Sequence, residues 1–580
     1  MSLDIATALK RKSLFLIHIF IILLLPLSCG KQPDHHFLKI GLHEEPKTLN
    51  IWLASDANSK QILSLIYQPL YLRDPETLNL IPWLADGEPK YHPDTISYTV
   101  RLKPAKWSDG SDVTSKDVAF TAAIIKEFRV PRYYSSWKFI KRIETPNSRT
   151  VRFYLEEPTA IFLTRTLTSS IVSTKEWTSI AQSARAKQKP LAALINQKIE
   201  KPVGCGPFVL KKWQRGTYVH LEKNRYFFGL RENIGGRILG PYVNDLLFKV
   251  YGTADVAVLA LKKGSIDMFL WGIQPGYIDD LKRHKNIQLF YNKKSAVYFM
   301  GFNLRSPPFN DVSLRRAIAV LVDKEFIISR ILQKYGTPMD SIVPPGNQHW
   351  FCSDVPRYGE GMDRNHRIKT AYHILEKAGY TWEEPPVDGS DRVVLGKGIR
   401  LPNGQLMEKF TILTPPADYD PHRAMSGMMI QEWLRALGMP VLSRPMAFGA
   451  LITQVKGRHE FDAFILGYGR LSLDPDYLRN FFHSANDKQG GWNMSGYNNP
   501  EFDHIAEKSA HEMNQEQRQK LIFKMQKIIM ADVPYIPIYN PALIEAVRKD
   551  TFGGWVETLD GIGNLWSFCL VKPNSGKTGQ

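Results

Sequence analysis

The sequence predicts an α/β fold in several domains, and three observations support this prediction. The chain has 580 residues, which at about 150 residues per domain is more than one compact unit. Its 43% hydrophobic and 23% charged residues are typical of globular proteins and exclude disordered and fibrous classes. Segments with the two-residue period of strands alternate with segments of helical spacing, a pattern typical of sheets layered with helices.

Candidate strands and helices recur from residue 37 onward. Short apolar or alternating segments predict strands at residues 37–42, 97–102, 150–155, 218–222, 246–251, 296–303, 409–413 and 461–466. Apolar residues spaced three and four apart predict helices at residues 59–70, 115–126, 313–322, 325–334, 369–378, 422–437 and 515–530. Proline- and glycine-rich stretches at 236–241, 343–346 and 383–404 are expected to be surface loops.

Residues 1–28 have the features of an export signal peptide. A basic patch from Lys10 to Lys12 precedes an apolar stretch from Leu14 to Leu27. This stretch is shorter than the ~20 residues that a helix needs to cross a bilayer, so we expect no permanent anchor helix. The mature protein is therefore expected to be extracytoplasmic or periplasmic.

The signal peptide runs into Leu25-Pro26-Leu27-Ser28-Cys29-Gly30, which resembles the lipobox of bacterial lipoproteins. The resemblance implies that Cys29 is acylated and that residues 29–36 form a tether to a lipid membrane. Pro26 departs from the aliphatic residue usual at its position. The alternative is ordinary cleavage that leaves a free thiol on Cys29.

The net charge and the remaining cysteines set further limits. The formal charge is +18, but the 75 Lys and Arg residues form no run of five, so we expect no nucleic acid partner. The other cysteines are Cys205, Cys352 and Cys569. An oxidising compartment permits one disulfide bond among the three, the sequence does not choose the pair, and the odd number predicts a free thiol.

Sequence motifs for catalysis, metals and cofactors are missing. The 15 histidines and 4 cysteines give neither H-E-x-x-H nor C-x-x-C, so no metal or cofactor is predicted. G-x-S-x-G is absent, and the tail Gly576-Lys577-Thr578 lacks the first P-loop glycine because Val571 stands there. We predict that the protein is not an enzyme. A catalytic carboxylate pair leaves no sequence trace and stays open.

Residues 95–120 form the most specific motif. A predicted strand leads into the turn Lys106-Trp107-Ser108-Asp109-Gly110, and a helix opens after Val113. Thr114 or Ser115 can cap the first amides of this helix, and Asp117 complements its dipole.

Five further motifs occur along the chain in a fixed order. They are Glu45-Pro46-Lys47-Thr48-Leu49-Asn50, Gly204-Cys205-Gly206-Pro207-Phe208, Lys263-Gly264-Ser265-Ile266-Asp267, the stretch from Phe302 to Asp323 with Pro307-Pro308-Phe309, and Val533-Pro534-Tyr535-Ile536-Pro537-Ile538-Tyr539. With residues 95–120 they resemble the peptide-binding subunits of bacterial ABC importers, the extracellular solute-binding protein family 5. The resemblance covers nearly the whole mature chain.

The resemblance implies a two-lobed clamp of the type II periplasmic-binding-protein class with an additional domain. The implied divisions are lobe one at 37–57, 200–294 and 540–573, the extra domain at 58–199 and lobe two at 295–539. Closure of such a clamp on a ligand expels water and strengthens polar contacts inside.

The resemblance also implies candidate ligand-binding residues. Glu45 matches an acid beside the ligand, while Tyr134, Tyr468 and Tyr539 match aromatic lining positions. For each tyrosine, ordinary core packing is the competing interpretation.

One position departs from the family pattern. Where relatives commonly carry an aspartate that binds the α-ammonium of the peptide, this chain has Leu471, within Arg470-Leu471-Ser472-Leu473-Asp474-Pro475. Either Glu45, Asp474 or Asp476 substitutes for it, or the preferred ligand has no free α-amine there. Arg470 could also attract a carboxylate.

The function implied by the resemblance is a monomeric, lipid-anchored receptor that binds oligopeptides and delivers them to an ABC permease. The alternatives are a non-peptide ligand such as a nickel chelate, haem or an oligosaccharide, and a modified or cell-wall peptide. An extracytoplasmic hydrolase or a peptide chaperone is the rival from a different functional class.

Overall fold

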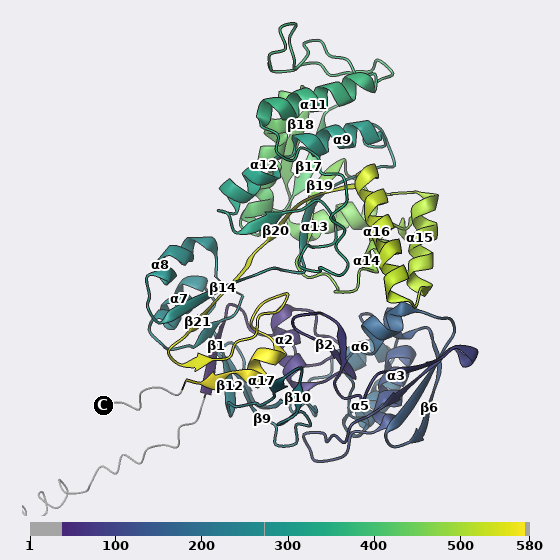
Figure 1. The fold of residues 1–580 in the computed structure, drawn as a ribbon, viewed down its shortest axis with the longest axis vertical. Helices are drawn as coiled ribbons and strands as arrows, with labels where there is room; N and C mark the ends of the chain where they lie inside the picture. The colour runs from purple at the N-terminus through teal and green to yellow at the C-terminus, as the bar shows by residue number, and fades with distance from the viewer. Residues whose placement is uncertain (1–36, 272, 575–580) are drawn as a thin grey trace, which may run out of the picture.

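The computed structural model describes residues 37–271 and 273–574. It shows two lobes and an extra domain, with lobe two in the upper half of the view, lobe one at lower left and the extra domain at lower right (Figure 1). The α/β class and the two-lobed architecture are confirmed. The predicted signal peptide, tether and acylated Cys29 lie outside the described residues.

Lobe one is built on a seven-stranded sheet with the order β14-β21-β13-β1-β12-β9-β8. Its central strand β1 runs parallel to β12 and β13. The strands are β1 (Phe37–Leu42), β8 (Phe208–Gln214), β9 (Tyr218–Lys223), β12 (Asp245–Val250), β13 (Met268–Phe269), β14 (Ile287–Asn292) and β21 (Leu543–Arg548). Its helices are α7 (Ala254–Lys262), α8 (Ile278–Lys282) and α17 (Leu565–Leu570), and α2 (Ala57–Ile66) begins at the predicted boundary with the extra domain. The sheet thus joins three separate stretches of sequence.

The extra domain contains a four-stranded antiparallel sheet with the order β4-β5-β7-β6. Its strands are β4 (Lys90–His92), β5 (Ser97–Arg101), β6 (Ile140–Asn147) and β7 (Thr150–Leu155), beside the hairpin of β2 (Tyr71–Arg73) and β3 (Leu80–Pro82). Its helices are α3 (Ser115–Glu127), α4 (Tyr134–Trp137), α5 (Thr174–Arg185) and α6 (Pro190–Ile195). The predicted α3 start is confirmed, because Thr114 is its N-cap and donates its backbone N–H to Asp117 at 2.8 Å.

Lobe two is built on a six-stranded sheet with the order β16-β20-β15-β19-β17-β18. The strands are β15 (Val297–Phe302), β16 (Gly336–Pro338), β17 (Phe410–Thr414), β18 (Val441–Pro445), β19 (Ala463–Tyr468) and β20 (Tyr535–Pro541). Its longer helices are α9 (Val312–Leu321), α11 (Arg364–Lys377), α12 (Pro421–Ala436), α14 (Tyr477–Phe482), α15 (Pro500–His511) and α16 (Gln515–Asp532). Apolar clusters cover both faces of this sheet, which explains its nearly continuous apolar strands. The domain boundaries themselves stay a prediction.

Short elements complete the fold. They are β10 (Asn233–Ile234), β11 (Arg237–Ile238), β22 (Phe552–Gly553), β23 (Lys572–Pro573), α10 (Lys324–Phe326), α13 (Phe448–Ile452), 3-10 turns at Pro93–Thr95, Pro275–Tyr277 and Ser484–Asn486, and π turns at Phe162–Thr166, Ile327–Ile331 and Thr453–Arg458.

Two predicted helices end earlier than expected. The helix predicted at 59–70 stops at Ile66, because Pro69 lacks a backbone N–H and restricts the residue before it. The helix predicted at 325–334 is α10 followed by a π turn to Ile331, and Gln333 and Lys334 adopt positive φ angles of 50° and 69°. Left-handed backbone at these two residues ends the helix.

The chain crosses between the lobes as two neighbouring strands. β14 pairs antiparallel with β21 in lobe one, and their continuations β15 and β20 pair antiparallel in lobe two. The buried side chain of Asn540 links the crossings, donating from Nδ2 to the carbonyls of Lys294 and Ala296 at 2.8 Å each. The hinge is therefore a two-stranded ribbon with one side-chain cross-link.

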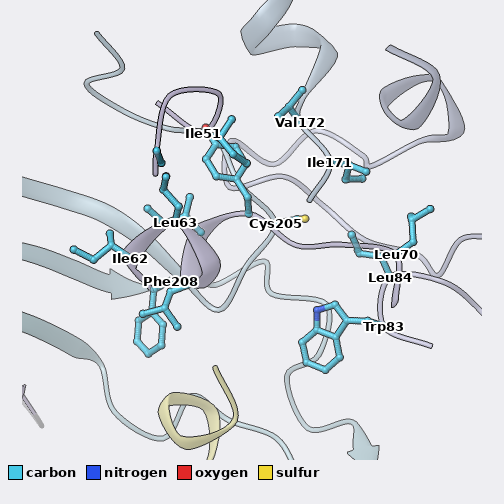
Figure 2. Close-up of a cluster of buried hydrophobic side chains, with 14 of the residues drawn as sticks. Ile51, Ile62, Leu63, Leu70, Trp83, Leu84, Ile171, Val172, Cys205 and Phe208 are labelled. Carbon is cyan, nitrogen blue, oxygen red and sulfur yellow. The ribbon is translucent and has the colours of Figure 1, made fainter. Parts of the chain in front are cut away.

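All three cysteines in the described part of the chain are buried free thiols. Cys205 lies among apolar side chains that include Ile51, Leu70 and Phe208 (Figure 2). The disulfide bond that the compartment would permit is therefore not formed among them.

The two glycines beside Cys205 are required by close backbone contact. A Cβ on Gly204 would lie 1.9 Å from the carbonyl oxygen of Ile66, and one on Gly206 would lie 2.3 Å from that of Leu65. The segment that returns to lobe one thus packs directly on the last turn of α2, which explains the Gly-x-Gly pattern physically.

We expect Gly204→Ala to lower the free energy of unfolding by about 3 kcal/mol, because backbone on both sides of the contact must move. Urea unfolding followed by circular dichroism measures this change. Gly449→Ala in α13, where a Cβ meets no atom within 4 Å, is the control and should not destabilise the protein. Equal stability of the Gly204 variant and the wild type would contradict the close-contact explanation.

Candidate ligand-binding site

Lobe two contacts lobe one through the loop that follows β19. Arg470 in this loop forms an ion pair from Nε to Oδ2 of Asp560 in lobe one, at 3.2 Å. The other carboxylate oxygen of Asp560 accepts the backbone N–H of Ser295 at 2.8 Å. One aspartate therefore contacts both the hinge and the opposite lobe.

Lobe two also touches the extra domain, far from the hinge. Nε2 of His511 at the end of α15 lies 3.3 Å from Oε1 of Glu157. The Oγ1 atom of Thr159 donates to the carbonyl of Ala510 at 3.4 Å. Lobe two thus makes polar contacts both with lobe one and with the extra domain.

Leu471 is part of the lobe-two core. It is 7% exposed and belongs to the same apolar cluster as Tyr477 and Phe481. Its backbone N–H donates to the carbonyl of Ser295 at 2.5 Å, and the Ser295 hydroxyl donates back to its carbonyl at 3.0 Å. The two hydrogen bonds with Ser295 hold the loop against the hinge, and the leucine side chain has no charge with which to bind a ligand.

The three acids that could replace the family aspartate missing at Leu471 all have hydrogen-bond partners within the protein. Glu45 accepts the backbone N–H of Gly216 at 2.9 Å. Asp474 receives two hydrogen bonds from Arg518 at 2.7 and 2.8 Å, and the side chains are 0% and 3% exposed. Burial alone would raise the pKa of Asp474, but the charge and hydrogen bonds of Arg518 outweigh it and hold this pKa well below its usual range.

Asp476, the third of these acids, accepts hydrogen bonds from Nε and Nη2 of Arg479 at 2.9 and 3.1 Å. A ligand ammonium at Asp474 or Asp476 would have to compete with an arginine, whereas Glu45 is engaged by a single backbone N–H. Their roles as ligand contacts remain predictions.

Two of the predicted tyrosines pack within lobe two. Tyr468 stacks between Phe299 and Phe481, with ring centroids 5.5 and 4.4 Å away. Tyr539 is 1% exposed and stacks on Tyr298 at 4.9 Å. The hydroxyls of Tyr468 and Tyr539 are buried and have no hydrogen-bond partner within the described residues, although both retain polar capacity.

Tyr134, the third predicted tyrosine, lies at the start of α4 in the extra domain. It is half-buried, and the guanidinium of Arg129 lies 6.0 Å from its ring centroid. The three tyrosines therefore do not form one cluster, and their role in binding a ligand stays a prediction.

Lys60 on α2 is a half-buried cation with a lowered pKa. Burial, followed by the charges of Arg132 and Arg470, lowers the pKa of Lys60 to about 8, while Asp56 acts in the opposite direction. The described residues provide no ion-pair partner for Lys60 or Arg132. The sequence analysis singled out neither Lys60 nor Arg132, because they share no motif with the predicted site residues.

A cavity of about 340 Å³ lies between the extra domain and lobe two. Its wall includes Arg73, His349, Trp350, Glu512 and Arg518. A neighbouring cavity of about 310 Å³ reaches the hinge and shares some of its lining. None of the predicted ligand-binding residues lines either cavity, and no local sequence pattern marked these cavities, whose walls join distant segments.

Glu545 on β21 is a fully buried acid next to the hinge. Its Oε2 accepts the backbone N–H of Ile562 at 2.6 Å, while its Oε1 has no partner among the described residues. The pKa of Glu545 is raised to about 7, chiefly by burial, with the amides of Ile562 and Gly563 and the charge of Lys294 acting against the increase and Asp560 adding to it. Glu545 thus supports the loop at 558–563, which carries the interlobe contact of Asp560.

Within residues 37–271 and 273–574, no cluster of three or more His, Cys, Asp or Glu side chains could hold a metal ion. In the same residues, no helix has both the length and the apolar character needed to cross a membrane.

A family model described as "Bacterial extracellular solute-binding proteins, family 5 Middle" matches residues 79–489. The chain belongs to this family. The resemblance predicted from the six motifs is thereby confirmed, and the family is one of extracytoplasmic substrate-binding transport proteins.

The family relatives extend over almost the whole chain. The oligopeptide-binding protein AppA of Bacillus subtilis is 26% identical over 552 residues, covering 94% of this chain and 93% of AppA. Among solved structures, the oligopeptide-binding protein of Thermotoga maritima has a TM-score of 0.76 at 22% identity, covering 93% of this chain and 100% of that chain. NikZ of Campylobacter jejuni, solved with Ni(L-His), has a TM-score of 0.71 at 22% identity, covering 93% and 99% of the two chains.

We expect the stability contributed by protonated Glu545 to be lost as the pH rises. The folded state raises its pKa from 4.5 to about 7, so this contribution is fully present below pH 4.5 and disappears as the pH rises through 7. Relative to Glu545→Gln, the wild type should lose about 3 kcal/mol between these limits, measured by urea unfolding at a series of pH values. Glu557→Gln, at an exposed position near the same loop, should retain the wild-type profile. Parallel profiles for wild type and Glu545→Gln would contradict the burial argument.

Proposed function

We propose that the protein is the substrate-binding subunit of an ABC importer, which takes oligopeptides between its lobes and passes them unchanged to a membrane permease. Membership in family 5 supports this proposal, as do relatives described as oligopeptide- and dipeptide-binding proteins. The observation that carries it is the two-stranded hinge with its Asn540 cross-link. Such a hinge lets two rigid lobes close on a ligand without breaking either sheet.

The main chain of the ligand is the proposed point of recognition. An extended peptide offers backbone donors and acceptors at regular spacing, and exposed strand ends can pair with them. The loop after β19 supplies such an edge at Gly469, which is exposed and where an added Cβ would meet no atom within 4 Å. We propose that this glycine leaves room for the peptide backbone.

Acylation of Cys29 remains part of the proposal. A lipid anchor followed by residues 29–36 would keep a monomeric receptor at the membrane surface, near the permease. Mass measurement of the mature N-terminal peptide from the native host tests this prediction, which an unmodified cysteine would refute.

A non-peptide ligand is the competing possibility within the same fold. Structures of related proteins include one in complex with agropinic acid and one with bound mannohexaose. Isothermal titration calorimetry with a pool of tetra- to nonapeptides, Ni(L-His) and mannohexaose compares the ligand classes directly. We expect heat of binding with the peptides alone and recovery of intact peptide by mass spectrometry. Binding of only the chelate or the sugar would refute the peptide proposal, and cleaved peptide would indicate a hydrolase.

We expect Gly469→Leu to weaken peptide binding at least tenfold, because the new side chain would occupy the proposed path of the ligand backbone. Calorimetry measures the loss. Gly449→Leu is the matched control, since it also adds a side chain where no atom lies within 4 Å but lies in α13. Unchanged affinity of the Gly469 variant would place the peptide elsewhere.

A further inference from the structure

We propose that the ligand places an aromatic side chain against the ring of Tyr419, so that the receptor selects peptides with an aromatic residue at one position. The inference rests on the proposed function, because it specifies the chemistry of the peptide that the two lobes take up. It concerns one side chain of the ligand and leaves the recognition of its backbone unchanged.

Tyr419 lies at the edge of lobe two that contacts lobe one. β17 runs parallel to both β18 and β19, so the loops that follow these three strands leave the sheet at the same edge. The loop after β19 carries Arg470, which forms the ion pair with Asp560 of lobe one. Tyr419 lies in the loop after β17, and Phe448 begins α13 after β18. Ligands of α/β sheets bind beyond the carboxyl ends of the parallel strands, which is where both rings lie.

The ring of Tyr419 stacks on the ring of Phe448. Their centroids are 4.7 Å apart, and the ring planes differ by 14°. The guanidinium carbon of Arg423 lies 5.6 Å from each of these centroids and 5.7 Å from the ring centroid of Tyr298. Tyr298 in turn packs against the end of β19, since a Cβ on Gly467 would lie 2.4 Å from its ring. Direct contacts therefore connect the stack to the strand that leads into the proposed path of the peptide backbone.

The loop that carries Tyr419 is fixed by hydrogen bonds within lobe two. The backbone N–H groups of Tyr419 and Asp420 both donate to the carbonyl of Pro416, at 3.1 and 3.0 Å. Asp420 accepts the Nε–H of Arg423 at 2.7 Å and the backbone N–H of the same residue at 3.0 Å. The side chains of Arg423 and Asp420 are 7% and 17% exposed. The rings are therefore in place before a ligand arrives, which lowers the entropic cost of binding.

The stack is ordered but accessible. Tyr419 is 55% exposed, which is the largest exposed fraction of any Phe, Tyr or Trp in residues 37–271 and 273–574. The residues beside Phe448 in the chain are small and exposed, namely Ala447, Gly449 and Ala450. They leave room next to the rings for a group from outside the protein. A tyrosine that only packs in lobe two is buried, as Tyr539 is at 1% exposure.

An aromatic ring of the ligand suits this surface better than an aliphatic or a cationic group. A third ring would extend the stack of Tyr419 on Phe448, and aromatic pairs gain free energy beyond that of the apolar area they bury. An aliphatic side chain would gain only from burial. A cationic side chain would meet rings whose π electrons already face the positive charge of Arg423. The matching ligands are peptides that carry Phe, Tyr or Trp at the position facing this loop.

Calorimetry on the full mature protein with substituted pentaalanine peptides tests the proposal. One set carries a single phenylalanine at each position in turn, and matched sets carry cyclohexylalanine or lysine instead. Cyclohexylalanine is similar to phenylalanine in size and apolar character but has no π electrons. We expect one position at which the phenylalanine peptide binds about fivefold more tightly than the cyclohexylalanine peptide, as for one added stacking contact, and at which the lysine peptide binds most weakly.

Variants assign the preference to the stack. Tyr419→Ala should abolish the preference for phenylalanine over cyclohexylalanine, whereas Tyr419→Phe keeps the ring and should retain it. Phe326→Ala is the control and should also retain the preference. Phe326 is an exposed aromatic residue of the same lobe, but it lies on α10 and packs against Trp433 with ring centroids 5.8 Å apart. Thermal unfolding of each variant verifies that it is folded, and the comparison of peptides on the wild type requires no variant.

The outcomes separate the two proposals. Equal affinities for phenylalanine and cyclohexylalanine at every position would overturn the aromatic inference while peptide binding stands. A preference for phenylalanine that survives Tyr419→Ala, or tighter binding of lysine than of phenylalanine at every position, would also overturn it. Failure of every peptide to bind would overturn the proposed function and the inference together.

Discussion

The ribbon of two strands that joins the lobes constrains most of the molecule. In this ribbon β14 continues into β15 and β20 continues into β21, so that each strand belongs to one sheet on either side of the hinge. Asn540 holds the two crossings together through hydrogen bonds to the carbonyls of Lys294 and Ala296. Because a strand alternates its side chains between two faces, the register of this ribbon decides which residues of both sheets face their cores. It also places Ser295 where it can bind both Asp560 and Leu471.

The loop after β19 combines two roles that are usually separate. Its apolar residue Leu471 and its acid Asp474 stabilise lobe two, the first through packing and the second through Arg518. Arg470 is exposed and contacts the other lobe. Structural groups and cleft groups thus alternate within a few residues, so a change in the sequence of this loop affects ligand chemistry and stability together.

Local structure was predictable where one short segment determines it. The limits of β7 coincide with the predicted strand at 150–155, and the start of α3 follows from Thr114 and Asp117. Packing contacts could be explained only from the structure. An example is the close backbone contact of Gly204 with Ile66, which is distant in sequence. The motifs predicted the class of the fold, but not the order of strands that meet from distant stretches.

The candidate site was only partly predictable for the same reason. Arg470 was singled out, but its ion-pair partner Asp560 comes from a segment with no shared pattern. Asp474 was a candidate ligand contact because no sequence pattern indicates that it pairs with Arg518, which is 44 residues away. Periodicity reports burial along one element, whereas charge pairing depends on how elements meet.

Burial shields the thiols of the described residues from redox reagents in solution. Cys205 and Cys569 are 0% and 1% exposed, and burial raises the pKa of Cys205 to about 12, so the reactive thiolate is scarce. An oxidant or an alkylating reagent gains access to these sulfurs only when the surrounding core opens. The rate at which they react consequently reports transient opening of lobe one, without any added label.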